Sequence, residues 1–167
     1  PTVYYSRSAT ATGFPGLDWH TAASWSTVSH VGAAATNFPQ AGDIAIIGSG
    51  NTGANNHHAI FAQNADVNVA ELRFATVPGG TFSPRVTIRQ DRDFTAIRVS
   101  GPGTFMTQIQ AGAGNTPIIL GDFGDFAEEI TSNYIYIQTA DSGTPLAIPT
   151  NPTIYPNLRF EAGNGGI

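Results

Sequence analysis

Apolar residues in this chain recur at every second position, in short runs bounded by Gly, Pro, Asn or Asp. A period of two places successive side chains on opposite faces of a β-strand. The pattern predicts strands at Val3–Ser6, Ile44–Ile47, Ala59–Ala62, Val67–Phe74, Arg85–Gln90, Thr95–Ser100, Thr104–Gln110, Pro117–Leu120, Tyr134–Thr139 and Leu158–Phe160. The chain is therefore predicted to be all-β.

Helical periodicity is nearly absent. Gly, Pro and β-branched residues interrupt almost every window that is long enough for three helical turns. The best candidate for a helix is the segment from Asp125 to Ile130, which has room for one or two turns.

Within the strands, apolar residues alternate with Thr, Arg and Gln. Between Val67 and Phe74 the alternation slips once, at Ala70. This pattern indicates strands with one buried and one solvated face, which suits a β-sandwich or a β-solenoid.

Two features favour a solenoid over the alternative, a β-sandwich. Glu71–Phe74 and Asn157–Phe160 are near copies, as expected when successive coils repeat the same local strand pattern. The loops between strands also differ in length, as they do when the corners of a coil carry insertions. We predict one β-rich domain over residues 1–167, with a cap in residues 1–40 and β-coils in residues 41–167.

Composition and charge narrow the class of partner. Charged residues make up 11% of the chain, against roughly 25% in an average soluble domain, and the net charge is −5. All seven basic residues are arginine, so no broad cationic surface is expected for nucleic acid or anionic lipid. Cysteine is absent, which excludes thiol catalysis and disulfides. No apolar run approaches the roughly 18 residues of a membrane span.

The two ends of the sequence differ from those of a typical complete chain. It begins with Pro1, and after Phe160 it runs into a Gly-rich turn. We interpret the chain as the N-terminal fragment of a longer polypeptide.

Several motifs in a fixed order resemble a known group of proteins. They are Tyr4–Arg7, Asp18–Ser26, Pro39–Gly48 and Tyr155–Leu158. Together they resemble the N-terminal region of Bacteroidota surface proteins that are exported by the type IX secretion system, and they are similar to G8-type β-helical modules. The resemblance implies the opening coils of a right-handed parallel β-helix.

The function implied by the resemblance is structural and adhesive. It implies an extracellular or cell-surface location, the outer-membrane secretion machinery as a partner, and polysaccharide or another cell surface as a ligand. No catalytic group is evident, so the chain is predicted not to be an enzyme. The alternative is the N-terminal part of a β-helical polysaccharide lyase or glycoside hydrolase.

Aromatic residues are frequent in the first quarter of the chain. Trp19, Trp25 and Tyr5 are candidates for glycan binding, because exposed aromatic rings stack on the apolar faces of sugars. For the two tryptophans, Trp25 above all, we favour a structural interpretation in which they plug the open end of the solenoid.

One acidic segment is a candidate for calcium binding, the only cofactor that we consider. Asp122, Asp125, Glu128 and Glu129 lie within eight positions, and Ca²⁺ prefers several oxygen ligands from a flexible turn. The alternative is an acidic surface loop in which Asp125 caps a short helix.

Two further clusters have residue types that are found in active sites. His57 and His58 are adjacent and would point apart, so we expect a solvated loop and not a metal site. Asp91 and Asp93, with the neighbouring arginines Arg89 and Arg92, have the types used for glycan cleavage. The alternative is that these residues lie on the solvent-exposed face of a strand edge and turn, where cross-strand charge pairs are common.

Overall fold

The computed structural model describes residues 1–7, 17–50, 58–109, 117–138, 155 and 157–162, which form two six-stranded sheets. Sheet A contains β1 (Val3–Ser6), β3 (Trp25–Ser26), β4 (Ile44–Gly48), β6 (Val67–Ala75), β8 (Phe94–Ser100) and β10 (Ile119–Asp122). Sheet B contains β2 (Leu17–Asp18), β5 (Ala59–Ala62), β7 (Arg85–Ile88), β9 (Thr104–Ile109), β11 (Asn133–Gln138) and β12 (Leu158–Ala162).

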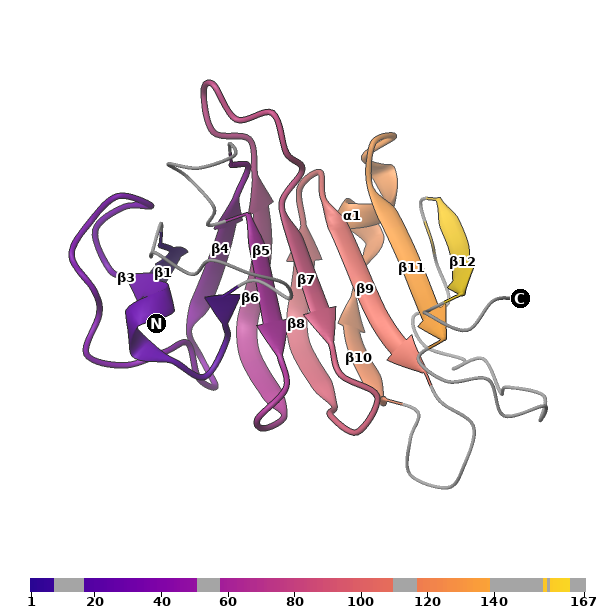
Figure 1. Cartoon of the computed structure of the whole chain (residues 1–167), viewed down its shortest axis with the longest axis horizontal. Helices are drawn as coiled ribbons and strands as arrows, with labels where there is room; N and C mark the ends of the chain where they lie inside the picture. Colours follow the sequence, from indigo (N-terminus) through magenta and orange to yellow (C-terminus); the bar gives the residue numbers. More distant parts are fainter. Residues whose placement is uncertain (8–16, 51–57, 110–116, 139–154, 156, 163–167) are drawn as a thin grey trace.

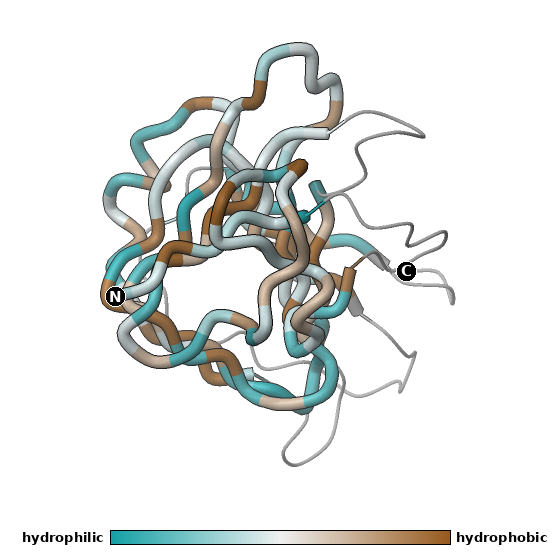
Figure 2. The backbone as a smooth tube through the Cα atoms, turned by 90° about the vertical axis from the view of Figure 1, so that its left-hand side faces the viewer, coloured by the Kyte–Doolittle hydropathy of each residue, from teal (hydrophilic) through white to brown (hydrophobic). Residues whose placement is uncertain are grey.

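From β4 to β11 the chain alternates between the two sheets, so that each coil gives one strand to each sheet (Figure 1). Neighbouring strands within a sheet are parallel, except for the antiparallel pair β1 and β3. Figure 2 looks along the stack from the N-terminal side and shows coils wound around a common interior. The fold is therefore a parallel β-solenoid, as the sequence predicts, and the alternative β-sandwich is wrong.

All ten predicted strands are present, with ends that differ by no more than two residues within the described ranges. The short helix is α1 (Gly124–Glu128), which lies between β10 and β11. The sequence analysis did not predict β2 and β3, because these two-residue strands have no apolar alternation. None of the helices in the described ranges has the length and hydrophobicity needed to cross a bilayer.

The core is built from columns of inward side chains that are stacked in register from coil to coil. In sheet B one column is fully buried across five strands, and its members are Leu17, Ile60, Val86, Phe105 and Tyr134. Each such side chain contributes roughly 1.5–3 kcal/mol through removal of apolar surface from water. Stacked burial of this kind is the main stabilising term of a solenoid, because each coil covers its neighbour.

The N-terminal cap contains β1, β2, the 3₁₀ turn η1 (Ala22–Ser24) and β3. Strand β3 is the outermost member of sheet A at this end (Figure 1), and β2 is the outermost member of sheet B. Trp19 and Trp25 are completely buried here, with ring centroids 5.0 Å apart in an edge-to-face arrangement. The Trp25 indole N–H donates to the Trp19 carbonyl over 2.7 Å. The cap is therefore closed by packed indoles.

Aspartates stabilise the corners of the coils, each of which directly precedes a strand of sheet A. The Asp43 carboxylate accepts the Thr2 N–H at 2.9 Å, and Asp66 accepts the Asp93 N–H at 2.9 Å. Asp93 in turn accepts the Ile118 N–H at 2.8 Å. Each carboxylate thus links its own corner to the matching corner of a neighbouring coil, and we call this series of hydrogen bonds the corner ladder.

The turn between β8 and β9 fits closely over a phenylalanine. Gly101 has a φ of 80°, and a Cβ there would lie 1.9 Å from the Phe74 carbonyl oxygen. A Cβ on Gly103 would lie 2.4 Å from the Phe74 ring. Only glycine satisfies both the left-handed backbone and the close approach. Phe126 of α1 packs against the same phenylalanine, with ring centroids 5.5 Å apart.

The near-copied motifs lie in opposite sheets. Leu72 and Phe74 belong to β6 in sheet A, whereas Leu158 and Phe160 belong to β12 in sheet B. Leu158 and Phe160 pair in register with the buried Tyr134 and Tyr136 of β11, so their side chains share its inward face. The two copies therefore share a local strand pattern, but they do not occupy equivalent positions in successive coils.

Candidate functional site

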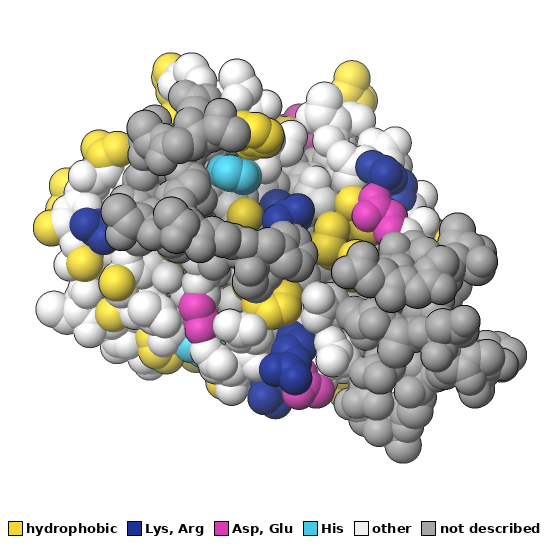
Figure 3. Space-filling view, viewed as in Figure 1, with side chains coloured by type: hydrophobic (Ala, Val, Ile, Leu, Met, Phe, Trp, Pro, Cys, Tyr) yellow, Lys and Arg dark blue, Asp and Glu magenta, His cyan; other side chains and the backbone are white. Residues whose placement is uncertain are grey.

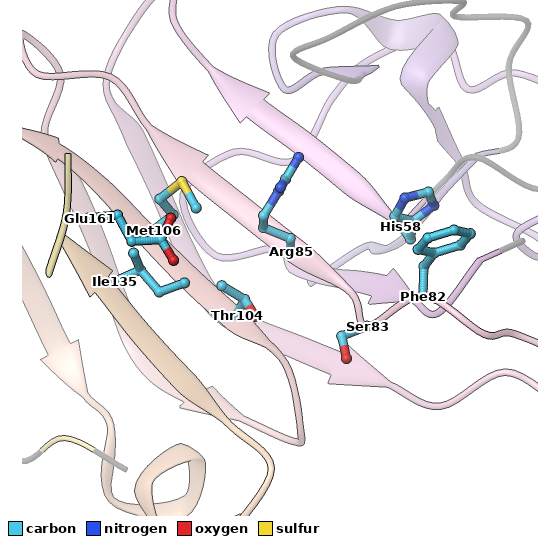
Figure 4. Close-up of a pocket in the computed structure, with 8 residues that line it drawn as sticks. All are labelled: His58, Phe82, Ser83, Arg85, Thr104, Met106, Ile135 and Glu161. Carbon is cyan, nitrogen blue, oxygen red and sulfur yellow. The ribbon is translucent and has the colours of Figure 1, made fainter. Parts of the chain in front are cut away.

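A groove of about 300 Å³ lies on the outer face of sheet B. It is lined by residues from consecutive coils, namely His58, Phe82, Ser83, Arg85, Thr104, Met106, Ile135 and Glu161. The lining crosses β7, β9, β11 and β12 and therefore follows the axis of the solenoid (Figure 4). Its volume is at the lower end of the roughly 300–1,000 Å³ of small-molecule sites.

The aromatic end of the groove is formed by His58 and Phe82. Their rings are stacked, with centroids 5.0 Å apart and an interplanar angle of 18°. Phe82 is 40% exposed, so part of its ring is open to solvent. Its backbone is fixed by a bridge to Gly50, in which the Phe82 N–H donates to the Gly50 carbonyl over 2.8 Å.

Arg85 lies in the middle of the groove, between the aromatic pair and the apolar side chains (Figure 4). Its backbone N–H donates to the His58 carbonyl over 2.6 Å, which ties it to the preceding coil. Burial lowers the pKa of the Arg85 guanidinium, and the nearby charge of Glu161 opposes this shift. The guanidinium is therefore a partly desolvated cation.

The far end of the groove is apolar on one side and acidic on the other. Met106 and Ile135 point outward from their strands, yet they are only 9% and 5% exposed. Glu161 is held by Arg159, whose Nη2 lies 2.8 Å from its Oε1. Figure 3 shows that arginine, acidic and apolar side chains are all present on this face of the molecule. The groove thus offers an aromatic ring, a cation, hydroxyls and a carboxylate.

The prediction that Trp19 and Trp25 bind glycans is wrong. Both residues are completely buried, so neither indole presents a face on which a sugar could stack. They form the plug at the N-terminal end, which is the interpretation that the sequence analysis favours. Tyr5 is partly exposed in sheet A, where its ring meets the edge of His30 at 5.4 Å. It belongs to the opposite sheet from the groove.

The four carboxylates proposed for calcium are exposed and do not converge. Among the described residues, no group of three or more His, Cys, Asp or Glu side chains is close enough to hold a metal ion. Asp122 accepts the Gly124 N–H at 2.9 Å, and Asp125 forms an ion pair with Arg98. Calcium binding by Asp122, Asp125, Glu128 and Glu129 stays a prediction that this geometry does not support.

Asp125 does not cap the helix as expected. The N-cap of α1 is Phe123, and the Asp125 carboxylate lies in the first turn, where it pairs with Arg98.

The two other clusters considered from the sequence differ in their outcome: the aspartate and arginine cluster is structural, whereas one of the two histidines lines the groove. Asp91 pairs with Arg89 at 3.1 Å and with Arg92 at 3.7 Å, and the Arg92 Nε donates to the Gln63 carbonyl. Asp93 belongs to the corner ladder. His57 lies outside the described residues, whereas His58, which we expected in a solvated loop, lines the groove.

A buried carboxylate on sheet A is also structural. Glu71 is only 9% exposed, and it accepts hydrogen bonds from both Nε and Nη2 of Arg73 at 3.2 and 2.9 Å. The Ser100 hydroxyl donates to it over 3.1 Å, and Arg98 lies 3.6 Å away. This network is internally satisfied, so it leaves the groove on sheet B as the candidate functional site.

Sequence reasoning did not find the groove. Its members come from separate coils, and the outward positions of a strand acquire neighbours only through the register between coils. The comparisons with known proteins add no family to this geometry. No protein-family model, curated protein or solved structure matches this chain.

Proposed function

We propose that this chain is a rigid structural and adhesive module of a secreted or cell-surface bacterial protein, and that it binds glycans in the groove on sheet B. The observation that carries the proposal is the groove itself, in which an exposed aromatic ring and polar groups are aligned along the solenoid axis. The low charge of the chain and its resemblance to Bacteroidota surface proteins support the location and the type IX export route.

Rigidity favours binding because the groove is preorganised. Arg85, Thr104, Ile135 and Glu161 lie on strands that are paired in continuous parallel ladders. Neighbouring strands are held about 4.8 Å apart, so the spacing of these side chains changes little when a ligand binds. An extended polymer that lies along the axis would meet side chains from one coil after another.

The chemistry of the lining suits a saccharide. The exposed part of the Phe82 ring offers a flat apolar surface, and such surfaces stack on the apolar faces of sugar rings. Ser83 and Thr104 offer hydroxyls, while Arg85 and Glu161 offer charged donors and acceptors for sugar hydroxyls.

A glycan array with the purified chain tests the proposal, and calorimetry then measures the affinity for the strongest ligand. We expect Phe82→Ala to weaken binding about five- to tenfold, since an aromatic contact is worth roughly 1–1.4 kcal/mol. Ile97→Ala is the matched control, because Ile97 is 77% exposed on the outer side of sheet A. Absence of binding to every glycan would refute the adhesive role, and an equal loss in both variants would place the site elsewhere.

A second candidate is glycan cleavage. Arg85 and Glu161 lie in one groove, and a cation with a carboxylate is a combination used in acid and base chemistry on sugars. Incubation of the chain with each glycan that it binds tests this candidate. New reducing ends would indicate hydrolysis, and new absorbance from unsaturated uronates would indicate elimination. An intact glycan after prolonged incubation would leave binding as the function.

A further inference from the structure

We propose that the C-terminal end of sheet B is a dimerisation edge, at which β12 pairs antiparallel with β12 of a second copy of this chain. The pair is centred on Phe160, and the two copies are related by a twofold axis. Such a dimer forms whether or not the groove binds a glycan, so it goes beyond the proposed function.

The end of the solenoid that carries β12 is open, in contrast to the N-terminal cap. β12 is the outermost strand of sheet B, and no described strand pairs with its second edge (Figure 1). Leu158 and Phe160 continue the inward columns of Tyr134 and Tyr136, yet they are 42% and 54% exposed. This end therefore presents apolar side chains that lack the coil-to-coil cover of the inner strands.

The edge of β12 is also the most regular of the described sheet edges. β12 has five residues in unbroken register with β11, whereas β2 and β3 have two residues each. The register of β10, the last described strand of sheet A, shifts between Leu120 and Asp122. A regular open edge is a template for pairing with another strand.

The outward side chains of β12 are complementary to themselves. Arg159 and Glu161 alternate with the inward residues and form an ion pair at 2.8 Å. An antiparallel partner reverses the order of the strand, so that Arg159 lies directly opposite the partner's Glu161, and Glu161 lies opposite the partner's Arg159. An in-register parallel partner would instead set like charges side by side. The charge pattern therefore favours a second copy in the antiparallel direction.

The inward side chains fit the same arrangement. The Phe160 ring is stacked on the Tyr136 ring, with centroids 5.6 Å apart and an interplanar angle of 14°. In a pair centred on Phe160, this residue lies directly opposite its own copy, so the two exposed rings cover one another. Each copy then shields the apolar end of the other, as neighbouring coils do within the solenoid.

The dimer also brings two grooves together. Glu161 belongs to β12 and lines the groove. A twofold axis perpendicular to sheet B keeps the outer faces of both copies on one side. The two grooves therefore meet at the interface, where the partner's Arg159 lies beside Glu161.

Sedimentation velocity with the full chain, over a range of concentrations, tests the inference. We expect the wild type to show an equilibrium between monomer and dimer. Arg159→Glu and Glu161→Arg should each weaken self-association about tenfold, because both replace attractive cross-strand pairs with repulsive ones. A mixture of the two variants should dimerise at least as well as the wild type, since every opposed pair in the mixed dimer is attractive.

The mixture separates contact between copies from the stability of β12. Each variant keeps two like charges within its own strand, both alone and in the mixture. Recovery of the dimer in the mixture can therefore arise only from pairing between the two chains.

Cysteine cross-linking tests the register. The chain contains no cysteine, so Phe160→Cys introduces the only thiol. Directly opposed residues of an antiparallel pair have Cα atoms roughly 4.5–5.5 Å apart, a distance that a disulfide can span. With copper phenanthroline as the oxidant, we expect a covalent dimer of Phe160→Cys. Ile97→Cys, at an exposed position of sheet A, is the control and should remain mostly monomeric.

Four results would overturn the inference. They are a wild type that stays monomeric at the highest concentration it tolerates, self-association that grows beyond dimers, a mixture that dimerises no better than either variant alone, and equal cross-linking of the two cysteine variants. If circular dichroism shows that a charge variant does not fold, sedimentation of the wild type and the cross-linking of Phe160→Cys still decide the outcome.

Discussion

Replacement of Trp25 by alanine tests whether the N-terminal indoles are a plug. Full burial of a tryptophan removes roughly 200 Å² from water, which corresponds to about 5 kcal/mol at ~25 cal/mol per Å². Alanine recovers a small part of this, and measured Trp→Ala changes in cores cost about 3–5 kcal/mol. The lost indole hydrogen bond to the Trp19 carbonyl adds about 1 kcal/mol. We therefore expect Trp25→Ala to lower the free energy of unfolding by about 4–6 kcal/mol.

Urea unfolding followed by circular dichroism measures this change. Trp25→Phe is the matched control, since it keeps an aromatic ring in the plug and should cost about 1–2 kcal/mol. The chain has two tryptophans, and both lie in the cap, so intrinsic fluorescence reports directly on this end. A loss below about 1 kcal/mol in Trp25→Ala, accompanied by weaker glycan binding, would refute the plug and restore the tryptophans as a sugar site.

Three further changes test the turns, the aromatic core and the corner ladder. Gly101→Ala should cost at least about 3 kcal/mol in urea unfolding because its Cβ would meet the Phe74 carbonyl, whereas Gly79→Ala, also at positive φ but in open space, should cost about 1 kcal/mol; equal costs would contradict the steric argument. Burial raises the pKa of the Tyr134 hydroxyl, so its contribution to stability is present below about pH 10 and is lost as the pH rises and the unfolded tyrosine releases its proton. Melting temperatures between about pH 9 and pH 12 should therefore fall less steeply in Tyr134→Phe, and identical slopes would show that another group controls alkaline unfolding. Asp93→Ala should cost about 1–2 kcal/mol by removing the acceptor for the amide of the next coil, while Asp93→Asn, which keeps an acceptor, should retain most of the stability; a similar loss in both would argue against the ladder.

The strands could be predicted because alternation is a local property. In β6 the inward residues Val67, Val69, Leu72 and Phe74 identify the strand and its buried face without reference to any other coil. Even the slip at Ala70 is real, since Ala70 and Glu71 both lie between inward neighbours. The same local signal also limited the helix prediction to one short segment, as observed.

The coil repeat could not be predicted because the corners differ in length. Ile60 pairs with Val86, which is 26 residues further along, and Val86 pairs with Phe105 after only 19 residues. Phe105 then pairs with Tyr134 after 29 residues. A sequence search for a fixed period finds none, although the side chains stack in one column.

The groove could not be predicted because the alternation pattern indicates only that the outward residues of each strand face solvent. Met106 and Ile135 share one register position on the outside of sheet B, and both are nearly buried there. Arg85 and Glu161 lie far apart in sequence and come together only through the stacking of coils. Conversely, the aromatic residues near the N-terminus suggested a sugar site, but Trp19 and Trp25 are buried because they cover the core at the end of the solenoid.

The shortness of β2 and β3 has a consequence for self-association. Each outermost strand at this end is only two residues long, and β3 runs against the direction of the strand beside it. An incoming polypeptide would find few unpaired amides to template a new layer, and long, regular borders are what fibrils need in order to elongate. The arrangement thus acts as a terminator, which keeps a fold made of repeating layers from recruiting further molecules at this boundary.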